Sequence, residues 1–191
     1  MPSVKPTTSI KEYQQFVQEV YGLPNDRYFS LQDKLINAER FITRGLKGIR
    51  KGDVQKIKLN LIISLSWFMS VVNQFHIDVE EEVWKRFPHL CSYCAACPCG
   101  CKAQDQAGIH LVEEMGEVAE AIFTYHGNHN DDDFKKVIVE CADLFSCLIG
   151  VFNSLNINLV QELSEMFIDN CHACHQAPCV CNFVDITQFK S

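Results

Sequence analysis

The sequence predicts an all-α protein: a helical bundle built from two tandem repeats. Apolar residues recur at helical spacing through most of the chain, and no pair of alternating apolar and polar segments indicates two paired strands. A shift of 80 residues also brings the two halves into register, since it aligns Cys91 with Cys171. An internal repeat of this kind determines how every other motif is interpreted.

Two cysteine clusters mark the ends of the repeats. Both have the spacing C-x2-C-x4-C-x-C, and the same shift aligns Pro98 with Pro178. Other identical pairs at this shift are Leu31 and Leu111, Ile42 and Ile122, Ser66 and Ser146, Val71 and Val151, Asn73 and Asn153, Ile77 and Ile157, Glu82 and Glu162, and Phe87 and Phe167. We therefore predict two domains, residues 1–104 and residues 105–191, each a helical hairpin followed by a cysteine knuckle.

Periodicity and capping residues predict the helices in order. A leader helix over 9–21 starts with a capping box at Ser9 and Glu12, and the residues YGLPND are expected to end it. Predicted N-caps of later helices are Ser30, Asn130 or Asp131, and Asn158. The predicted helices are 30–51, 54–75 and 78–87 in the first repeat, and 107–126, 132–155 and 158–168 in the second. The tail from residue 182 is too short to assign.

Charge and hydropathy exclude several classes of partner. The chain has 17 basic and 24 acidic residues, a net charge of −7, and no dense Lys/Arg tract, so we expect no nucleic-acid binding. The most apolar run, 59–72, is too short to span a bilayer and predicts a buried helix, so we expect no membrane partner. The N-terminal residues lack the apolar core of a signal peptide. We expect a soluble, cytoplasmic protein.

Nine of the eleven cysteines fall in the two clusters. Without a secretory signal, such clusters favour metal ligation over disulfides. The first interpretation is two structural Zn²⁺ knuckles. An iron–sulfur cluster is the second, and redox-active thiols are a third. The predicted zinc ligands are Cys91, Cys94, Cys99 and Cys101 in the first knuckle, and Cys171, Cys174, Cys179 and Cys181 in the second, with Cys97, His172 and His175 as possible substitutes.

Four acidic residues lie beside the apolar stripes of the second hairpin. Glu114 and Glu117 form an i,i+3 pair on one predicted helix, and Glu140 and Asp143 form the same pair on the next. Carboxylates at the edge of a core repel one another unless a cation neutralises them. Oxygen ligands of this kind suit Mg²⁺ or Mn²⁺. The four residues therefore predict a divalent-metal site.

The residues EEMGE (113–117), followed after 22 residues by ECAD (140–143), resemble the EExxE…ExxD signature of the MazG-like all-α nucleotide pyrophosphohydrolases. This superfamily includes the dimeric dUTPases and the dCTP pyrophosphatases. The resemblance implies a nucleoside triphosphate substrate, hydrolysed with Mg²⁺ to the monophosphate and pyrophosphate. It also implies that Glu114, Glu117, Glu140 and Asp143 hold the metal, and that Glu113 orients or deprotonates the attacking water.

The first repeat lacks the acids. The 80-residue shift places Lys34, Asn37, Asn60 and Ile63 opposite the four predicted ligands. Because related domains dimerise, the chain resembles a dimer fused into one polypeptide, with one active and one supporting half; the fused chain could itself form a homo-oligomer. Two alternatives remain: a zinc-stapled interaction or regulatory module with a vestigial acid cluster, and a hydrolase of another phosphoanhydride.

Overall fold

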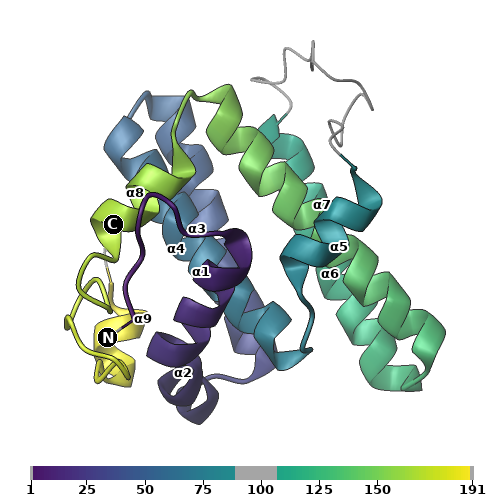
Figure 1. Cartoon of the computed structure of the whole chain (residues 1–191). Coiled ribbons are helices and arrows are strands. Elements are labelled where there is room, and N and C mark those ends of the chain that lie inside the picture. Colours follow the sequence, from purple (N-terminus) through teal and green to yellow (C-terminus); the bar gives the residue numbers. More distant parts are fainter. Residues whose placement is uncertain (1, 89–106, 190–191) are drawn as a thin grey trace. The chain divides into compact units, whose positions relative to one another are not determined.

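The computed structural model describes residues 2–88 and 107–189, and over these ranges the chain forms helices and no strands (Figure 1). The prediction of an all-α protein is therefore confirmed. The first cysteine knuckle, Cys91 to Cys101, and the predicted domain boundary at 104/105 lie outside the described residues.

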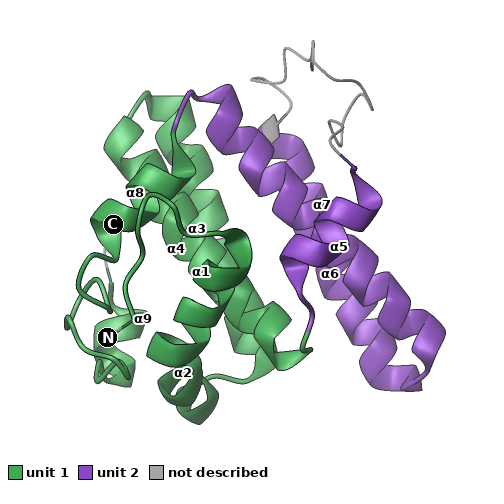
Figure 2. Cartoon of the chain, viewed as in Figure 1, with its two compact units in different colours: residues 1–76, 158–191 green, residues 77–157 purple. Residues whose placement is uncertain are grey.

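The chain divides into two compact units, one formed by residues 1–76 and 158–191 and the other by residues 77–157 (Figure 2). Unit 1 contains α1 (Ile10–Val17), the π-helical turn η1 (Gln18–Gly22), α2 (Leu23–Tyr28), α3 (Leu31–Lys51), α4 (Val54–Gln74), α8 (Leu159–Met166) and α9 (Phe183–Thr187). Unit 2 contains α5 (Val79–Arg86), α6 (Ala107–Asn128) and α7 (Asp131–Ser154).

Unit 2 is a hairpin of α6 and α7 with α5 packed on α7. The apolar stripes of the two long helices meet in its core, where Leu111, Val118, Leu144 and Leu148 are fully buried. Each such side chain contributes about 1.5–3 kcal/mol by leaving water. By length and composition alone α7 could cross a bilayer, but several of its apolar residues, Leu144 and Leu148 among them, are buried in this core.

Unit 1 has the same plan around α3 and α4. Their contact is close because Gly45 and Gly48 lie against Leu61 and Ile57, so a Cβ at either glycine would meet the facing side chain at under 3.0 Å. The leader helix α1 and α8 both pack on α4. A fully buried Phe68 lies in this core.

The short helices are exchanged between the repeats. Helix α5 follows α4 in the sequence but packs on α7, whereas α8 follows α7 but packs on α4 (Figure 2). The compact units therefore begin and end near residues 77 and 158, while the predicted domains follow the repeats. The repeats group helices that have similar sequences, whereas the compact units group helices that pack against each other.

Capping explains where most helices begin. Ser9 with Glu12 and Ser30 with Asp33 form capping boxes, and Asn130 caps α7, as predicted. One expectation was wrong, and one segment that the sequence left unassigned is helical. The YGLPND segment does not end the leader, because η1 continues the helix and Pro24 lies in the first turn of α2, where a missing N–H costs little. The tail forms α9, with a capping box at Asn182.

Candidate functional site

Three of the predicted acids converge in unit 2. Glu114 on α6 meets Glu140 and Asp143 on α7, and one carboxylate oxygen from each lies within 4.8 Å of the others. All three side chains are half-buried. The i,i+3 spacing places Glu140 and Asp143 on one face of α7, and the hairpin brings this face to Glu114. Three hard oxygen donors at this separation could hold one divalent cation.

Glu114 has an unpartnered oxygen atom in this group. Its Oε2 atom is buried and has no hydrogen-bond partner among the described residues. Burial raises the pKa of Glu114 to about 7, and repulsion by Asp143, Glu117 and Glu140 adds to this effect. Burial also raises the pKa of Glu140, again with repulsion from Glu117 and Asp143. Such a concentration of negative charge favours binding of a cation.

The remaining acids lie around this trio. Glu117 is exposed and stands outside the group of three, although its charge raises the pKa of both Glu114 and Glu140. Glu113 is exposed and its Oε2 lies 3.0 Å from Nδ1 of His110. Its predicted role beside an attacking water stays a prediction.

Arg86, at the end of α5, is part of the same site. Its Nη2 donates to Oδ2 of Asp143 at 2.6 Å, and its Nε donates to Oδ1. No sequence motif predicted this contact, since Arg86 belongs to the first repeat and lies far from the acidic motif along the chain. Cys147 was also missed as a neighbour of the site. Burial raises the pKa of its thiol to about 12, and the charge of nearby Glu114 adds to this effect.

Unit 1 contains no equivalent acid group among its described residues. Lys34 is 1% exposed and its Nζ donates to Oδ1 of Asp26 at 2.5 Å. The side-chain amides of Asn37 and Asn60 donate to the carbonyl oxygens of Asp33 and Lys56, at 2.9 and 2.6 Å. The fourth equivalent, Ile63, is buried. An ammonium, two internally bonded amides and a hydrocarbon offer no site for Mg²⁺.

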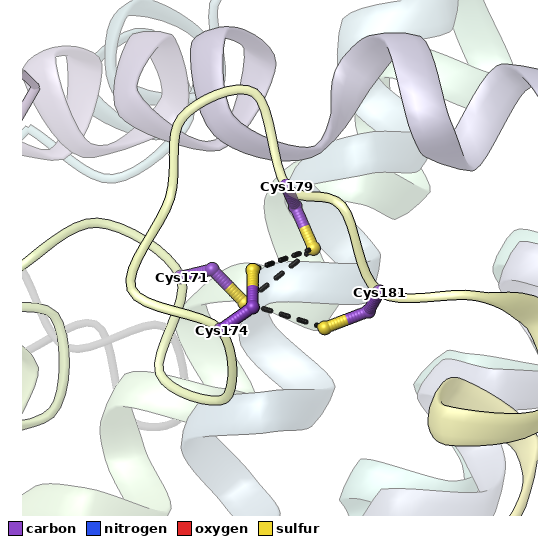
Figure 3. Close-up of side chains that lie close together, drawn as sticks. All are labelled: Cys171, Cys174, Cys179 and Cys181. Carbon is purple, nitrogen blue, oxygen red and sulfur yellow. Dashed lines mark hydrogen bonds between the residues drawn. The ribbon is translucent and has the colours of Figure 1, made fainter.

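The second cysteine knuckle brings its four thiols together in the loop between α8 and α9 (Figure 3). The Sγ atoms of Cys171 and Cys179 are 3.5 Å apart, those of Cys174 and Cys179 are 3.7 Å apart, and those of Cys171 and Cys181 are 3.9 Å apart. Around one tetrahedral ion with metal–sulfur bonds of about 2.3 Å, sulfurs are separated by about 3.8 Å. The arrangement could therefore hold a single metal ion.

Hydrogen bonding within this cluster favours a thiolate at Cys171. The thiol of Cys179 donates to Cys171 and lowers the pKa of Cys171, while the same pairing raises the pKa of Cys179. The thiolate is the form that ligates metals. The donor set and its protonation both fit a metal site.

The knuckle is joined to the leader within unit 1. The backbone N–H of Cys179 donates to the carbonyl of Val20 at 2.7 Å, and the Tyr21 hydroxyl lies 3.3 Å from Nδ1 of His172. Tyr21 and Cys171 also line an apolar cavity of about 70 Å³ that continues to α9. A metal bound here would fix the packing of the leader as well as that of its own loop.

Comparison with known proteins identifies no relative. No protein-family model, curated protein or solved structure matches this chain. The chemistry of the two sites therefore has to be argued from their own residues.

The raised pKa of Glu114 predicts how stability depends on pH. The Glu114 carboxyl has a pKa of about 7 in the folded chain and an ordinary value of 4.5, so it holds its proton more tightly when the chain is folded. The stability that this bound proton contributes is fully present below pH 4.5 and is lost as the pH rises through 7. Without added divalent cation, the part of the melting temperature that depends on Glu114 should fall over this window. Thermal melts of wild type and Glu114→Gln measure this, and parallel pH profiles of the two proteins would contradict it.

Proposed function

We propose that the chain is a Mg²⁺-dependent nucleoside triphosphate pyrophosphohydrolase, releasing a nucleoside monophosphate and pyrophosphate. The observation that carries the proposal is the convergence of Glu114, Glu140 and Asp143 across the hairpin of unit 2, with the Oε2 atom of Glu114 buried and unpartnered. These are residues of the motif that resembles the MazG-like signature.

Each residue of the site has a role in this proposal. Glu114, Glu140 and Asp143 would hold the divalent cation, and Glu117, at the edge of the group, would complete its ligands directly or through water. When bound, the cation neutralises phosphate charge and makes a coordinated water more nucleophilic. The partial burial of Glu114 would strengthen its attraction to the cation, because the local dielectric is lower than that of water. The hairpin core holds α6 and α7 in fixed register, so the acids are positioned before the substrate arrives.

Structural Zn²⁺ is proposed for the Cys171 knuckle, and a hydrolase of a different phosphoanhydride would use the same acid site. A second candidate function, a zinc-stapled interaction module, is favoured by exposed apolar side chains on α6. Phe123 is 80% exposed, Ile109 61% and Val112 43%. Under this alternative the acids would be vestigial.

The test is a panel of ribo- and deoxyribonucleoside triphosphates incubated with Mg²⁺. Ion-exchange chromatography separates a monophosphate with pyrophosphate from a diphosphate with orthophosphate. The proposal expects the first pair of products. In ¹⁸O-labelled water, attack at the α-phosphate would place the label in the monophosphate.

A matched preparation of Glu114→Gln removes the effect of contaminating phosphatases. Orthophosphate as the product, or equal activity in the variant preparation, would refute the proposal. Inactivity toward every nucleotide would favour the interaction module.

A further inference from the structure

The cation already present in the acid site is the guanidinium of Arg86. It engages both oxygens of Asp143 through Nε and Nη2, and its Nη1 group has no partner among the residues that the structure describes. The side chain is 41% exposed, whereas that of Asp143 is 15% exposed. Arg86 therefore lies between a half-buried carboxylate and the solvent from which a substrate would arrive.

The arginine is not repeated in the short helix of the other unit. In the 80-residue repeat, the counterpart of Arg86 is Met166, and the counterpart of Asp143 is Ile63. Helix α8 nevertheless packs on α4, as α5 packs on α7. The arginine is thus present in the unit that contains the acids and is replaced by methionine in the unit that lacks them.

A metal and Arg86 would share the carboxylate of Asp143. A cation held by Glu114, Glu140 and Asp143 would bind at least one oxygen of Asp143, and both oxygens accept a hydrogen bond from Arg86. Because the two positive charges repel each other, a bound cation would weaken the pair between Arg86 and Asp143. The N–H groups of Arg86 would then be available to phosphate, since a guanidinium matches the geometry of phosphate oxygens in a bidentate contact.

We propose that Arg86 is a phosphate-binding residue of the acid site, held by Asp143 until a divalent cation binds that carboxylate and weakens the ion pair. The inference rests on the proposed function, because it assumes a metal-bound polyphosphate in this site. It assigns the recognition of the phosphate chain to a residue of the first repeat. It also predicts that Arg86 opposes metal binding while favouring substrate binding.

The test compares Arg86→Met with wild type by two binding measurements that need no turnover. Mn²⁺ affinity is measured by electron paramagnetic resonance, and inorganic tripolyphosphate affinity is measured by calorimetry at saturating Mg²⁺. Loss of a competing, partly exposed ion pair should tighten Mn²⁺ binding about fivefold. Loss of a charge-assisted contact should weaken tripolyphosphate binding about tenfold. Methionine is chosen because the repeat has it at the equivalent position.

Two further variants make the outcome specific. Arg86→Lys keeps the positive charge but lacks the planar guanidinium that donates two parallel hydrogen bonds. This variant should bind Mn²⁺ nearly as wild type does and tripolyphosphate about threefold less tightly. Lys85→Met removes the neighbouring charge of α5, which pairs with Glu81 and Glu82, and should change neither affinity. This control separates the position of the charge from its effect on overall net charge.

The possible failures are distinguishable. Weaker Mn²⁺ binding by Arg86→Met would show that Arg86 positions Asp143, and unchanged tripolyphosphate affinity would remove the phosphate contact; either result overturns the inference alone. If wild type and Asp143→Asn bind Mn²⁺ equally, the metal site of the proposed function fails, and the inference fails with it.

Discussion

Glu114→Gln is expected to abolish Mg²⁺-dependent pyrophosphate release, lowering kcat/KM by roughly a thousandfold or more. The substitution keeps the shape of the side chain and removes the charge that a hard cation requires. The same change should raise the melting temperature of the metal-free protein by a few degrees. It replaces a carboxylate that burial and three neighbouring acids destabilise with a neutral amide.

Activity and stability should therefore move in opposite directions in this variant. Glu120→Gln is the matched control, since it makes the same charge change on the exposed side of the same helix and should leave both quantities unchanged. Turnover by Glu114→Gln within a few fold of wild type would remove Glu114 from the site. A lower melting temperature would show that its carboxylate stabilises the fold.

Cys171→Ser is expected to remove one metal ion per chain and to destabilise unit 1 by several kcal/mol. Cys171 is buried, and its Sγ lies close to those of Cys179 and Cys181, so the variant loses one donor of the predicted tetrahedral site. If both predicted knuckles bind zinc, elemental analysis should find about two zinc ions in wild type and about one in the variant. Hydrogen exchange should rise in the knuckle and in the leader, which is bonded to it through Val20.

Cys147→Ala serves as the control, because it removes a cysteine that lies outside the clusters. It should retain the metal content of wild type. Iron together with visible absorbance would support the iron–sulfur interpretation and refute zinc. An unchanged metal content in Cys171→Ser would exclude this cysteine as a ligand.

The sequence predicted those features that depend on local periodicity. The helical period of 3.6 residues predicts the two hairpins and places Glu140 and Asp143 on one face of α7. Most helix caps are likewise recognisable from neighbouring residues. None of these predictions requires knowledge of distant contacts. The four thiols of the second knuckle meet because their spacing along one short loop already brings them close. Local spacing was sufficient in these places.

The sequence could not predict the features that depend on which helices pack together. The contact between Arg86 and Asp143 depends on α5 joining the hairpin of the other repeat, and nothing within α5 specifies that partner. Likewise, Pro24 appears as a helix breaker in isolation. Its tolerance depends on the π-helical turn that precedes it and on its burial against the rest of unit 1.

The exchange of short helices has a consequence for how this chain can evolve. Arg86 and the acids that it faces lie in different repeats of the sequence, so a substitution in either repeat changes the same cluster of side chains. The first repeat has Lys34 and Ile63 where the second has acids, yet it supplies the helix whose arginine pairs with Asp143 in unit 2. The residues around the acids are therefore expected to vary together with those of α5, although the two segments belong to different repeats.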